Sequence, residues 1–279
     1  MARSDAETAG AGRSRSLPIG VMVAMAIMAI VVACALFGTY IAPDSPFTQR
    51  LQVGDAPPNA EFLAGTDLLG RDVLSRVIYG AWTALVGPIV VAASAFVLAT
   101  ILGLLSGYLG GWVDSVIMRW VDFMLALPGP LVAIVVVGVI GGGYWTAVLV
   151  LVILFTAPDT RIARSAVVGQ RPLPYIDAAR ALGISKTRIL FIHILPNVLP
   201  IVLANALLDF AFALVSLAGL SFLGLGVEPG TPDWGRMLFE NRNILFNNPT
   251  ALLLPATTII LTAVSMNLIG DWLFERLTK

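Results

Sequence analysis

The chain has 279 residues, of which 58% are hydrophobic and only 12% are charged, a composition that excludes an ordinary soluble domain. Its 17 basic and 17 acidic residues cancel, so no net charge favours a nucleic acid or an acidic partner. The single cysteine, Cys34, excludes an intrachain disulfide, and together with the single histidine, His193, it leaves almost no ligands for a metal centre.

Apolar runs of about 18 residues or more, long enough to cross a bilayer, recur along the sequence. They predict an all-α polytopic membrane protein with six transmembrane helices. The predicted spans are residues 19–41, 84–109, 123–141, 144–160, 198–220 and 250–273. The first span also resembles a cleaved signal peptide, because arginines precede it and Ala33-Cys34-Ala35 resembles a cleavage site. The apolar run continues past Cys34, however, which favours a membrane helix.

The distribution of basic residues predicts the topology. Most of the 17 fall in segments that share one side of the membrane when the six spans are inserted in turn, and the positive-inside rule assigns that side to the cytoplasm. Both termini are then cytoplasmic. The segments are a cytoplasmic 1–18, the first span 19–41, an extracytoplasmic 42–83, and a core of 84–279 that contains a cytoplasmic loop 171–197 and an extracytoplasmic loop 221–249.

Two charged stretches flank the second span. Asp72 to Gly80 predicts an amphipathic helix lying on the membrane surface, in a segment rich in proline, glycine and both charges. Asp114, Arg119 and Asp122 lie near the start of the third span, at the level of the interface. Pairing among charged side chains is the expected role of these three residues.

The cytoplasmic loop between spans four and five contains the start and stop signals of two short helices. Pro174 begins the first, Gly183 can adopt the left-handed conformation that ends it, Ser185 can cap the second, and Pro196 limits that second helix. Small side chains, Ala178 and its neighbours, allow another surface to approach closely. The same spacing also resembles the turn of a DNA-binding helix-turn-helix, but no room remains for a third helix between two spans. A solvated connecting loop is the remaining alternative.

One carboxylate lies deep inside a predicted span. Asp209 is eleven residues into span five, about 16 Å from its start at 1.5 Å per residue, and Asn205 lies one turn away on the same face. An unpaired charge at that depth costs about 2.5 to 3.5 kcal/mol. Asp209 and Asn205 are therefore predicted either to line a translocation pathway, where they could contact an ammonium group, or to pair with a neighbouring helix.

The segment from Ser221 to Phe246 mixes apolar side chains, glycines and Trp234. This pattern suits a segment folded back against the bundle as a gate, or a docking surface for another protein. The residues singled out for these roles are Ser221, Phe222, Leu223 and Trp234.

Four ordered motifs carry a resemblance to a known family. The cytoplasmic loop reads Asp177-Ala178-Ala179-x-x-x-Gly183, followed after nine residues by His193-x-Leu195-Pro196-Asn197. It resembles the EAA signature of ABC importer permeases, with Asp177 in place of the usual glutamate. The stretches 65–76, 107–114 and 220–226, with 267–271 near the end, resemble the C-type subunit of the dipeptide, oligopeptide and nickel permeases.

The resemblance implies a type I ABC importer permease fold and a location in the bacterial cytoplasmic membrane. It implies that Asp177, Ala178, Ala179 and Gly183 dock an ATPase, that Pro196 and Asn197 form a stiff junction to span five, and that His193 packs there. It also implies a second homologous permease, two ATPase subunits that bind ATP and Mg, and an extracytoplasmic binding protein for peptides.

The residues themselves support that division of labour. A Walker A loop needs Gly-Lys-Ser/Thr, but the only lysines, Lys186 and Lys279, follow Ser185 and Thr278. The chain is therefore expected to be a non-catalytic membrane subunit without a cofactor of its own. Open alternatives are an ATP-independent secondary transporter or channel, a membrane scaffold and, within the family, a nickel chelate or haem as substrate.

Overall fold

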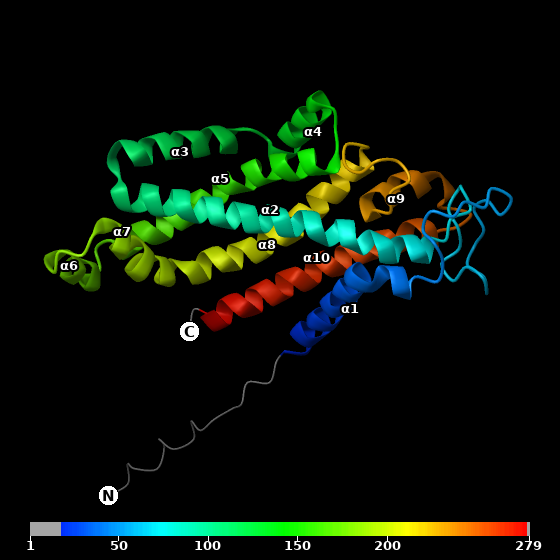
Figure 1. The fold of residues 1–279 in the computed structure, drawn as a ribbon, viewed down its shortest axis with the longest axis horizontal. Helices are drawn as coiled ribbons and strands as arrows, with labels where there is room; N and C mark the ends of the chain where they lie inside the picture. The colour runs from blue at the N-terminus through cyan, green and yellow to red at the C-terminus, as the bar shows by residue number, and fades with distance from the viewer. Residues whose placement is uncertain (1–17, 278–279) are drawn as a thin grey trace, which may run out of the picture.

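The computed structural model describes residues 18–277 as a bundle of long helices that lie roughly along one axis (Figure 1). The long helices are α1 (Ile19–Ile41), α2 (Val73–Leu109), α5 (Tyr144–Gln170), α8 (Leu195–Phe222) and α10 (Thr250–Leu277). The short α-helices are α3 (Gly111–Ala126), α4 (Gly129–Ile140), α6 (Pro174–Ala181), α7 (Lys186–Arg188) and α9 (Trp234–Asn241). We refer to the two ends of the bundle as the α6 end and the α9 end.

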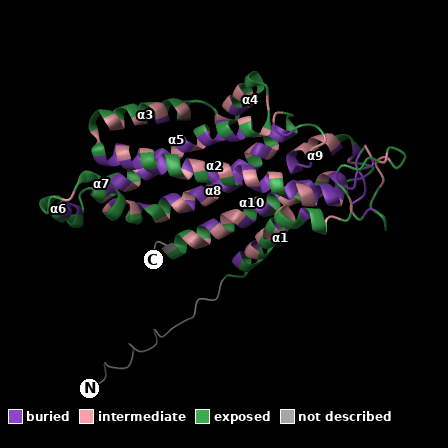
Figure 2. Ribbon diagram, in the orientation of Figure 1, coloured by how far each residue is buried: buried purple, intermediate pink, exposed green. Residues whose placement is uncertain are grey.

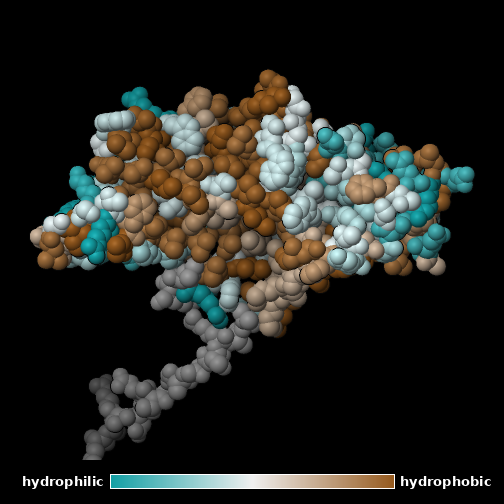
Figure 3. Space-filling view, in the orientation of Figure 1, coloured by the Kyte–Doolittle hydropathy of each residue, from teal (hydrophilic) through white to brown (hydrophobic). Residues whose placement is uncertain are grey.

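Five of these helices are long and apolar enough to cross a membrane, and the pair α3 and α4 gives a sixth span if it is counted as one. Figure 3 shows apolar side chains over the middle of the bundle and hydrophilic side chains gathered at the α9 end. The prediction of an all-α polytopic membrane protein is confirmed. Helix α1 packs on α2 and α10, as a span of the bundle does.

The third predicted span, 123–141, is not one straight helix. Helices α3 and α4 meet at an angle of 88°. Leu127 and Pro128 between them have extended backbones, because a residue before proline is driven out of the helical region and proline lacks an N–H donor. The 12 residues of α4 span only about 18 Å at 1.5 Å per residue, which is too short to cross alone.

The prediction of a surface helix over Asp72–Gly80 is wrong. Helix α2 begins at Val73, where the Asp72 carboxylate accepts a hydrogen bond from the Ser75 amide at 2.8 Å. The segment is therefore the first turns of a 37-residue helix rather than a separate amphipathic element. Val73 and Arg76 are fully buried by the loops and by α9, so this face never lies on a bilayer.

Pro196 does not end the second short helix as predicted. Helix α7 runs through a π-helical turn at Ile189–Ile194 (η1) into α8, so the helical chain is continuous from Lys186 to Phe222. In the π turn the Leu195 amide bonds to the carbonyl of Leu190, which widens the helix just before a residue that has no amide proton to donate.

Close packing of α2 against α5 forms the centre of the bundle. A Cβ atom added at Gly103 would lie 2.4 Å from the Ala163 side chain, and one added at Gly107 would lie 2.7 Å from Val167. Glycines four residues apart let two helix backbones approach, which is how helices associate where lipid supplies no hydrophobic drive. Figure 2 shows buried residues along α2, whereas α3 and α4 stay largely exposed.

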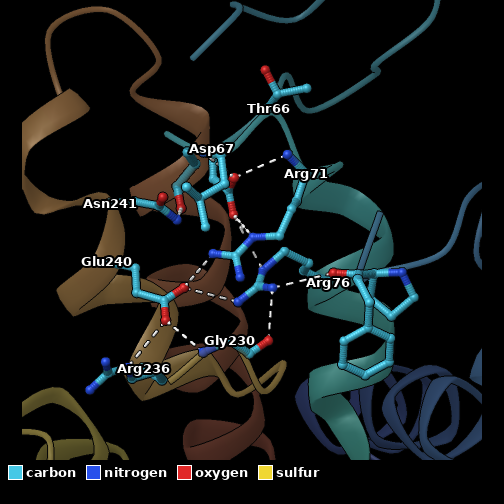
Figure 4. Close-up of polar contacts among 12 residues, drawn as sticks. Thr66, Asp67, Arg71, Arg76, Gly230, Arg236, Glu240 and Asn241 are labelled. Atoms are coloured by element: carbon cyan, nitrogen blue, oxygen red, sulfur yellow. Dashed lines mark hydrogen bonds and ion pairs between the residues drawn. The ribbon is translucent and has the colours of Figure 1, made fainter. Parts of the chain in front are cut away.

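A buried ion network closes the α9 end (Figure 4). The Glu240 carboxylate on α9 accepts from Arg71 at 2.7 Å and from Arg76 at 3.0 Å, and its other oxygen pairs with Arg236 at 3.2 Å. Arg71 also binds Asp67 at 2.6 Å. Arg76 is fully buried, and a buried guanidinium is tolerable only when it is paired in this way.

We call the loop before α2, the loop after α8 and α9 the cap of the bundle. Hydrogen bonds to backbone carbonyls complete it. Arg76 donates to the carbonyl of Gly230 at 3.1 Å, and the Asn248 amide donates to the carbonyl of Thr66 at 3.0 Å. Trp234 is buried, and its indole N–H donates to the carbonyl of Val77 at 2.8 Å. The loop before α2 and the loop after α8 are thus joined into one unit on the end of the bundle.

We predict that Glu240→Gln destabilises the protein by about 3–5 kcal/mol, because it leaves two buried guanidinium groups with one fewer anionic partner. Burial opposes ionisation of Glu240, but Arg76 and Arg71 outweigh it and hold the pKa of this carboxyl below its ordinary value of 4.5. Its stabilising contribution is therefore complete above pH 4.5 and is lost as the pH falls through the lower folded-state pKa.

Thermal unfolding of the detergent-purified protein, measured from pH 7 down to pH 3, checks this prediction. The wild type should lose stability below pH 4.5 by a step that Glu240→Gln lacks. Glu228→Gln, at an exposed position of the loop between α8 and α9, is the control and should behave as wild type. Equal unfolding profiles for the wild type and Glu240→Gln would contradict the argument.

Candidate functional site

The α6 end presents a short helix whose ends are set by its sequence. Pro174 occupies the first turn of α6, where its missing N–H costs nothing. Gly183 has φ of +71°, and the amides of Gly183 and Ile184 donate to the carbonyls of Arg180 and Ala179 at 3.0 and 3.1 Å. This is a Schellman closure, as the sequence predicted for Gly183.

One face of α6 is fixed to the bundle. Ile176 and Ala179 are buried in one apolar cluster with η1, Tyr108 at the end of α2 and Val167 near the end of α5. The guanidinium of Arg180 lies 5.7 Å from the centre of the Tyr108 ring, a cation–π contact. A displacement of α6 must therefore act on the ends of α2 and α5.

The other face of α6 is exposed. Asp177 and Ala178 lie on it, and among the described residues the one ion pair of the Asp177 carboxylate is with Arg180 of the same helix, at 3.1 Å. Leu182 just beyond the helix is 80% exposed, an unusual position for a large apolar side chain at a polar end of the bundle. Small and apolar residues therefore lie exposed at this end of the bundle.

The junction from α6 to α8 is made by side chains that the sequence singled out. The Asn197 amide donates to the carbonyl of His193 at 2.7 Å and to the Tyr175 hydroxyl at 3.3 Å, and that hydroxyl donates to Gln170 at 2.7 Å. Helices α5, α6 and α8 thus meet at Tyr175. Asn197 and Pro196 are exposed, and His193 contributes its backbone carbonyl to the junction.

The structure therefore brings the seven predicted coupling residues to one end of the molecule. Tyr175 and Gln170 complete the junction and were missed, because nothing in the local pattern distinguishes them from other loop residues. Their partners become adjacent only when the chain folds back.

Asp209 is buried between α8 and α5. The Asn205 amide donates to its carboxyl group at 3.3 Å and to the carboxyl group of Asp159 at 2.6 Å. Asp159 of α5 and Asp209 of α8 thus share the Asn205 amide. The sequence anticipated a partner for Asp209 on a neighbouring helix, and the structure places a second acid there, joined through Asn205, rather than a cation. Asp159, an aspartate inside predicted span four, was the available signal.

An apolar groove of about 490 Å³ lies on another side of α5 and α8. Its walls are Gly129, Pro130, Ala133 and Ile134 of α4, Leu151, Leu154, Phe155 and Pro158 of α5, and Phe212, Val215, Ser216, Gly219 and Leu220 of α8, with Leu223. Neither Asp209 nor Asn205 is among the described residues that line it. Asn205 faces a separate hollow of about 370 Å³ beside Gly270 and Asp271 of α10.

The segment after α8 folds back onto the bundle. The Gly143 amide at the turn between α4 and α5 donates to the carbonyl of Leu225 at 3.1 Å. Ser221 is buried, Phe222 packs edge-on against the Phe239 ring at 6.0 Å, and Leu223 stands at the mouth of the apolar groove. Trp234, in contrast, is buried in the cap.

We predict that Asp209→Asn assembles normally and keeps or gains stability. Asp209 and Asp159 both accept from the Asn205 amide, so two acids lie close together, whereas an amide at position 209 removes one acid and can itself donate to Asp159. Asp209→Leu, which has the same branching but a larger side chain, removes the polar partner and should cost at least about 1–3 kcal/mol. Thermal unfolding of both variants checks this. If Asp209→Asn were as damaging as Asp209→Leu, the cluster would require the charge itself.

Comparison with known proteins identifies the family. A sequence profile of the binding-protein-dependent transport system inner membrane component family matches residues 99–279, more than half of the chain. The Di/tripeptide transport system permease protein DppC of Pseudomonas aeruginosa (strain UCBPP-PA14) is 36% identical over 264 residues, which covers 92% of this chain and 87% of that protein.

Two further relatives cover most of the chain as well. The Dipeptide transport system permease protein DppC of Alkalihalophilus pseudofirmus is 35% identical, over 93% of this chain and 84% of its own length. The Glutathione transport system permease protein GsiD of Pectobacterium atrosepticum is 34% identical, over 89% of this chain and 83% of its own length.

The fold has a solved counterpart. A chain of the MetNI methionine ABC transporter in an inward facing conformation superposes with a TM-score of 0.57 at 18% identity, over 73% of this chain and 96% of that chain. This likeness supports the type I ABC importer permease fold that the sequence predicted. With a family profile over its core and relatives at 36% identity over nearly its whole length, the chain belongs to the inner membrane components of binding-protein-dependent ABC transport systems.

Proposed function

We propose that this chain is a transmembrane permease subunit of an ATP-driven importer that moves di- or oligopeptides across the cytoplasmic membrane. The observation that carries the proposal is the exposed helix α6, fixed to three membrane helices and followed by a continuous helix into α8. Peptide as substrate is supported by relatives that are named as dipeptide and di/tripeptide permeases.

The proposed partners follow from what the chain lacks and what it presents. Two ATPase subunits that bind ATP and Mg receive α6, with Asp177, Ala178, Ala179 and Gly183 at the contact. A second, homologous permease faces this one, and an extracytoplasmic binding protein delivers the peptide. The α6 end is then cytoplasmic, in accord with the basic residues near it.

The proposed mechanism is alternating access, in which closure of the ATPases moves α6. Because Ile176 and Ala179 are packed on the ends of α2 and α5, that motion is transmitted to both helices. Asn197 and Tyr175 transmit it to α8, which carries one wall of the apolar groove. A rigid junction is needed, since slack would absorb the displacement before it reached the groove.

The apolar groove between α4, α5 and α8 is the proposed translocation surface. Leu223 at its mouth and the neighbouring Ser221 and Phe222 are proposed as gate residues. Trp234 would act indirectly, by holding the gate segment to α2 through its hydrogen bond with Val77. Asp209 and Asn205 remain proposed pathway residues that substrate could reach after a rearrangement of α5 and α8.

Transport by the reconstituted complex tests the function. Proteoliposomes that contain this chain, its partner permease and the ATPases should take up a dipeptide such as dialanine only with ATP and the binding protein. The isolated subunit should bind no ATP, because it lacks the lysine-bearing phosphate loop. Uptake without ATP would instead favour a secondary transporter or channel, and uptake of a nickel chelate or haem in place of peptide would change the substrate.

We predict that Gly183→Val weakens ATPase docking without preventing membrane insertion. A Cβ atom there meets nothing within 4 Å, so the defect is the strain of a branched residue at φ of +71°, about 1–3 kcal/mol. Copurification of the ATPase should fall by about tenfold for each 1.4 kcal/mol of that strain. Gly183→Asn is the matched control, since asparagine tolerates this conformation. Full ATPase copurification and full peptide uptake with Gly183→Val would contradict the proposed role of α6 in coupling.

A further inference from the structure

A polar groove of about 590 Å³ lies between α3 and α5, separate from the sites described above. Five residues of α3 line it, together with Arg161 and Arg164 of α5. It lies in the half of the bundle toward the α6 end, because α3 begins directly after the end of α2 that packs against α6. The groove carries three arginines and two aspartates.

Two of the three arginines are already paired. Arg164 holds Asp114 through two parallel hydrogen bonds of 2.5 and 2.6 Å, with both side chains partly shielded. Arg161 pairs with Asp122, but here the side chains are 51% and 66% exposed. The first pair fastens α3 to α5. The second is open to solvent, so water or a ligand can replace either partner at little cost.

Arg119 is the exception. It is exposed and lines the groove, yet within residues 18–277 the structure gives it no ion pair and no hydrogen bond. The sequence suggested structural pairing as the role of Asp114, Arg119 and Asp122. Instead both aspartates pair across the groove with α5, which leaves Arg119 as a surplus guanidinium beside the open pair of Asp122 and Arg161.

This polar groove continues the apolar groove along one face of α5. Leu154 and Pro158 line the apolar groove, and Arg161 lines the polar one. These positions are four and three residues apart, so they form a single stripe on the helix surface. A solute that moves along α5 toward the α6 end therefore passes from an apolar wall to a wall of mixed charge.

We propose that the groove between α3 and α5 binds the charged termini of a peptide as it leaves the transporter toward the α6 end, with Arg119 holding the carboxylate and Asp122 the ammonium group. The inference rests on the proposed function of peptide import. A guanidinium without a partner matches a carboxylate in geometry, and an exposed aspartate beside it matches a cation. An anionic lipid headgroup such as phosphatidylglycerol fits less well, since it carries no ammonium group for Asp122.

Binding to the purified complex tests the proposal without the binding protein. Saturation-transfer NMR should detect dialanine on the wild-type complex, and Arg119→Gln should weaken that binding by about tenfold, the factor lost with one charge-assisted contact. Dialanine amide, which lacks the carboxylate, should bind equally to both. Arg119→Lys keeps the charge and should recover part of the binding, and Arg242→Gln, which removes an arginine at the α9 end, should leave it unchanged.

Three results would overturn the proposal. Dialanine binding and uptake could be the same with Arg119→Gln as in the wild type. Alternatively, Arg119→Gln could weaken the binding of dialanine amide as much as it weakens the binding of dialanine. Arg119→Gln could instead lose bound phosphatidylglycerol while peptide binding stays intact, which would assign the groove to lipid. ATP-driven dialanine uptake by the wild-type complex separates these failures from a failure of the proposed function, and unchanged thermal unfolding excludes a folding defect.

Discussion

The close approach of α2 and α5 is the contact on which the rest of the structure depends. Gly103 and Gly107 remove the side chains that would hold the two backbones apart, so Ala163 and Val167 pack directly onto α2. In a membrane this packing has to be dense, because lipid tails solvate apolar side chains as well as another helix does. The pair then serves as a frame: α6 sits on one end of it and the cap sits on the other.

The two ends of this frame are stabilised by different physics. At the α9 end, charged groups are buried and paired, so the cap is costly to open and joins two loops that are far apart in the sequence. At the α6 end, an apolar seat and a few neutral hydrogen bonds hold a helix whose outer face is free. The first arrangement joins loops within this subunit, whereas the second leaves one face of α6 exposed for the proposed contact with an ATPase.

The sequence predicted the parts of this molecule that are encoded locally. Span number, the left-handed Gly183 and the capping Ser185 follow from hydropathy and from backbone preference, which act within a few residues. The broken third span was missed although Pro128 and Pro130 mark it, because hydropathy averages across a break. Asp159 stands out as an acid inside predicted span four, but its place beside Asp209 could not be predicted, and neither could that of Arg71 and Arg76 around Glu240, since the identity of a partner helix is not written into either segment.

Four of the five long helices carry an interior proline: Pro88 in α2, Pro158 in α5, Pro200 in α8 and Pro255 in α10. Proline removes one backbone hydrogen bond and lowers the cost of bending at that level. Pro158 lies in the wall of the apolar groove, beside Pro130 of α4. Gly103 and Gly107 contact α5 on the α6 side of Pro158, and Gly87 contacts Tyr144 at the start of α5 on the other side. Helix α5 is therefore held on α2 on both sides of Pro158, so a bend of α5 at this level would have to draw α2 with it.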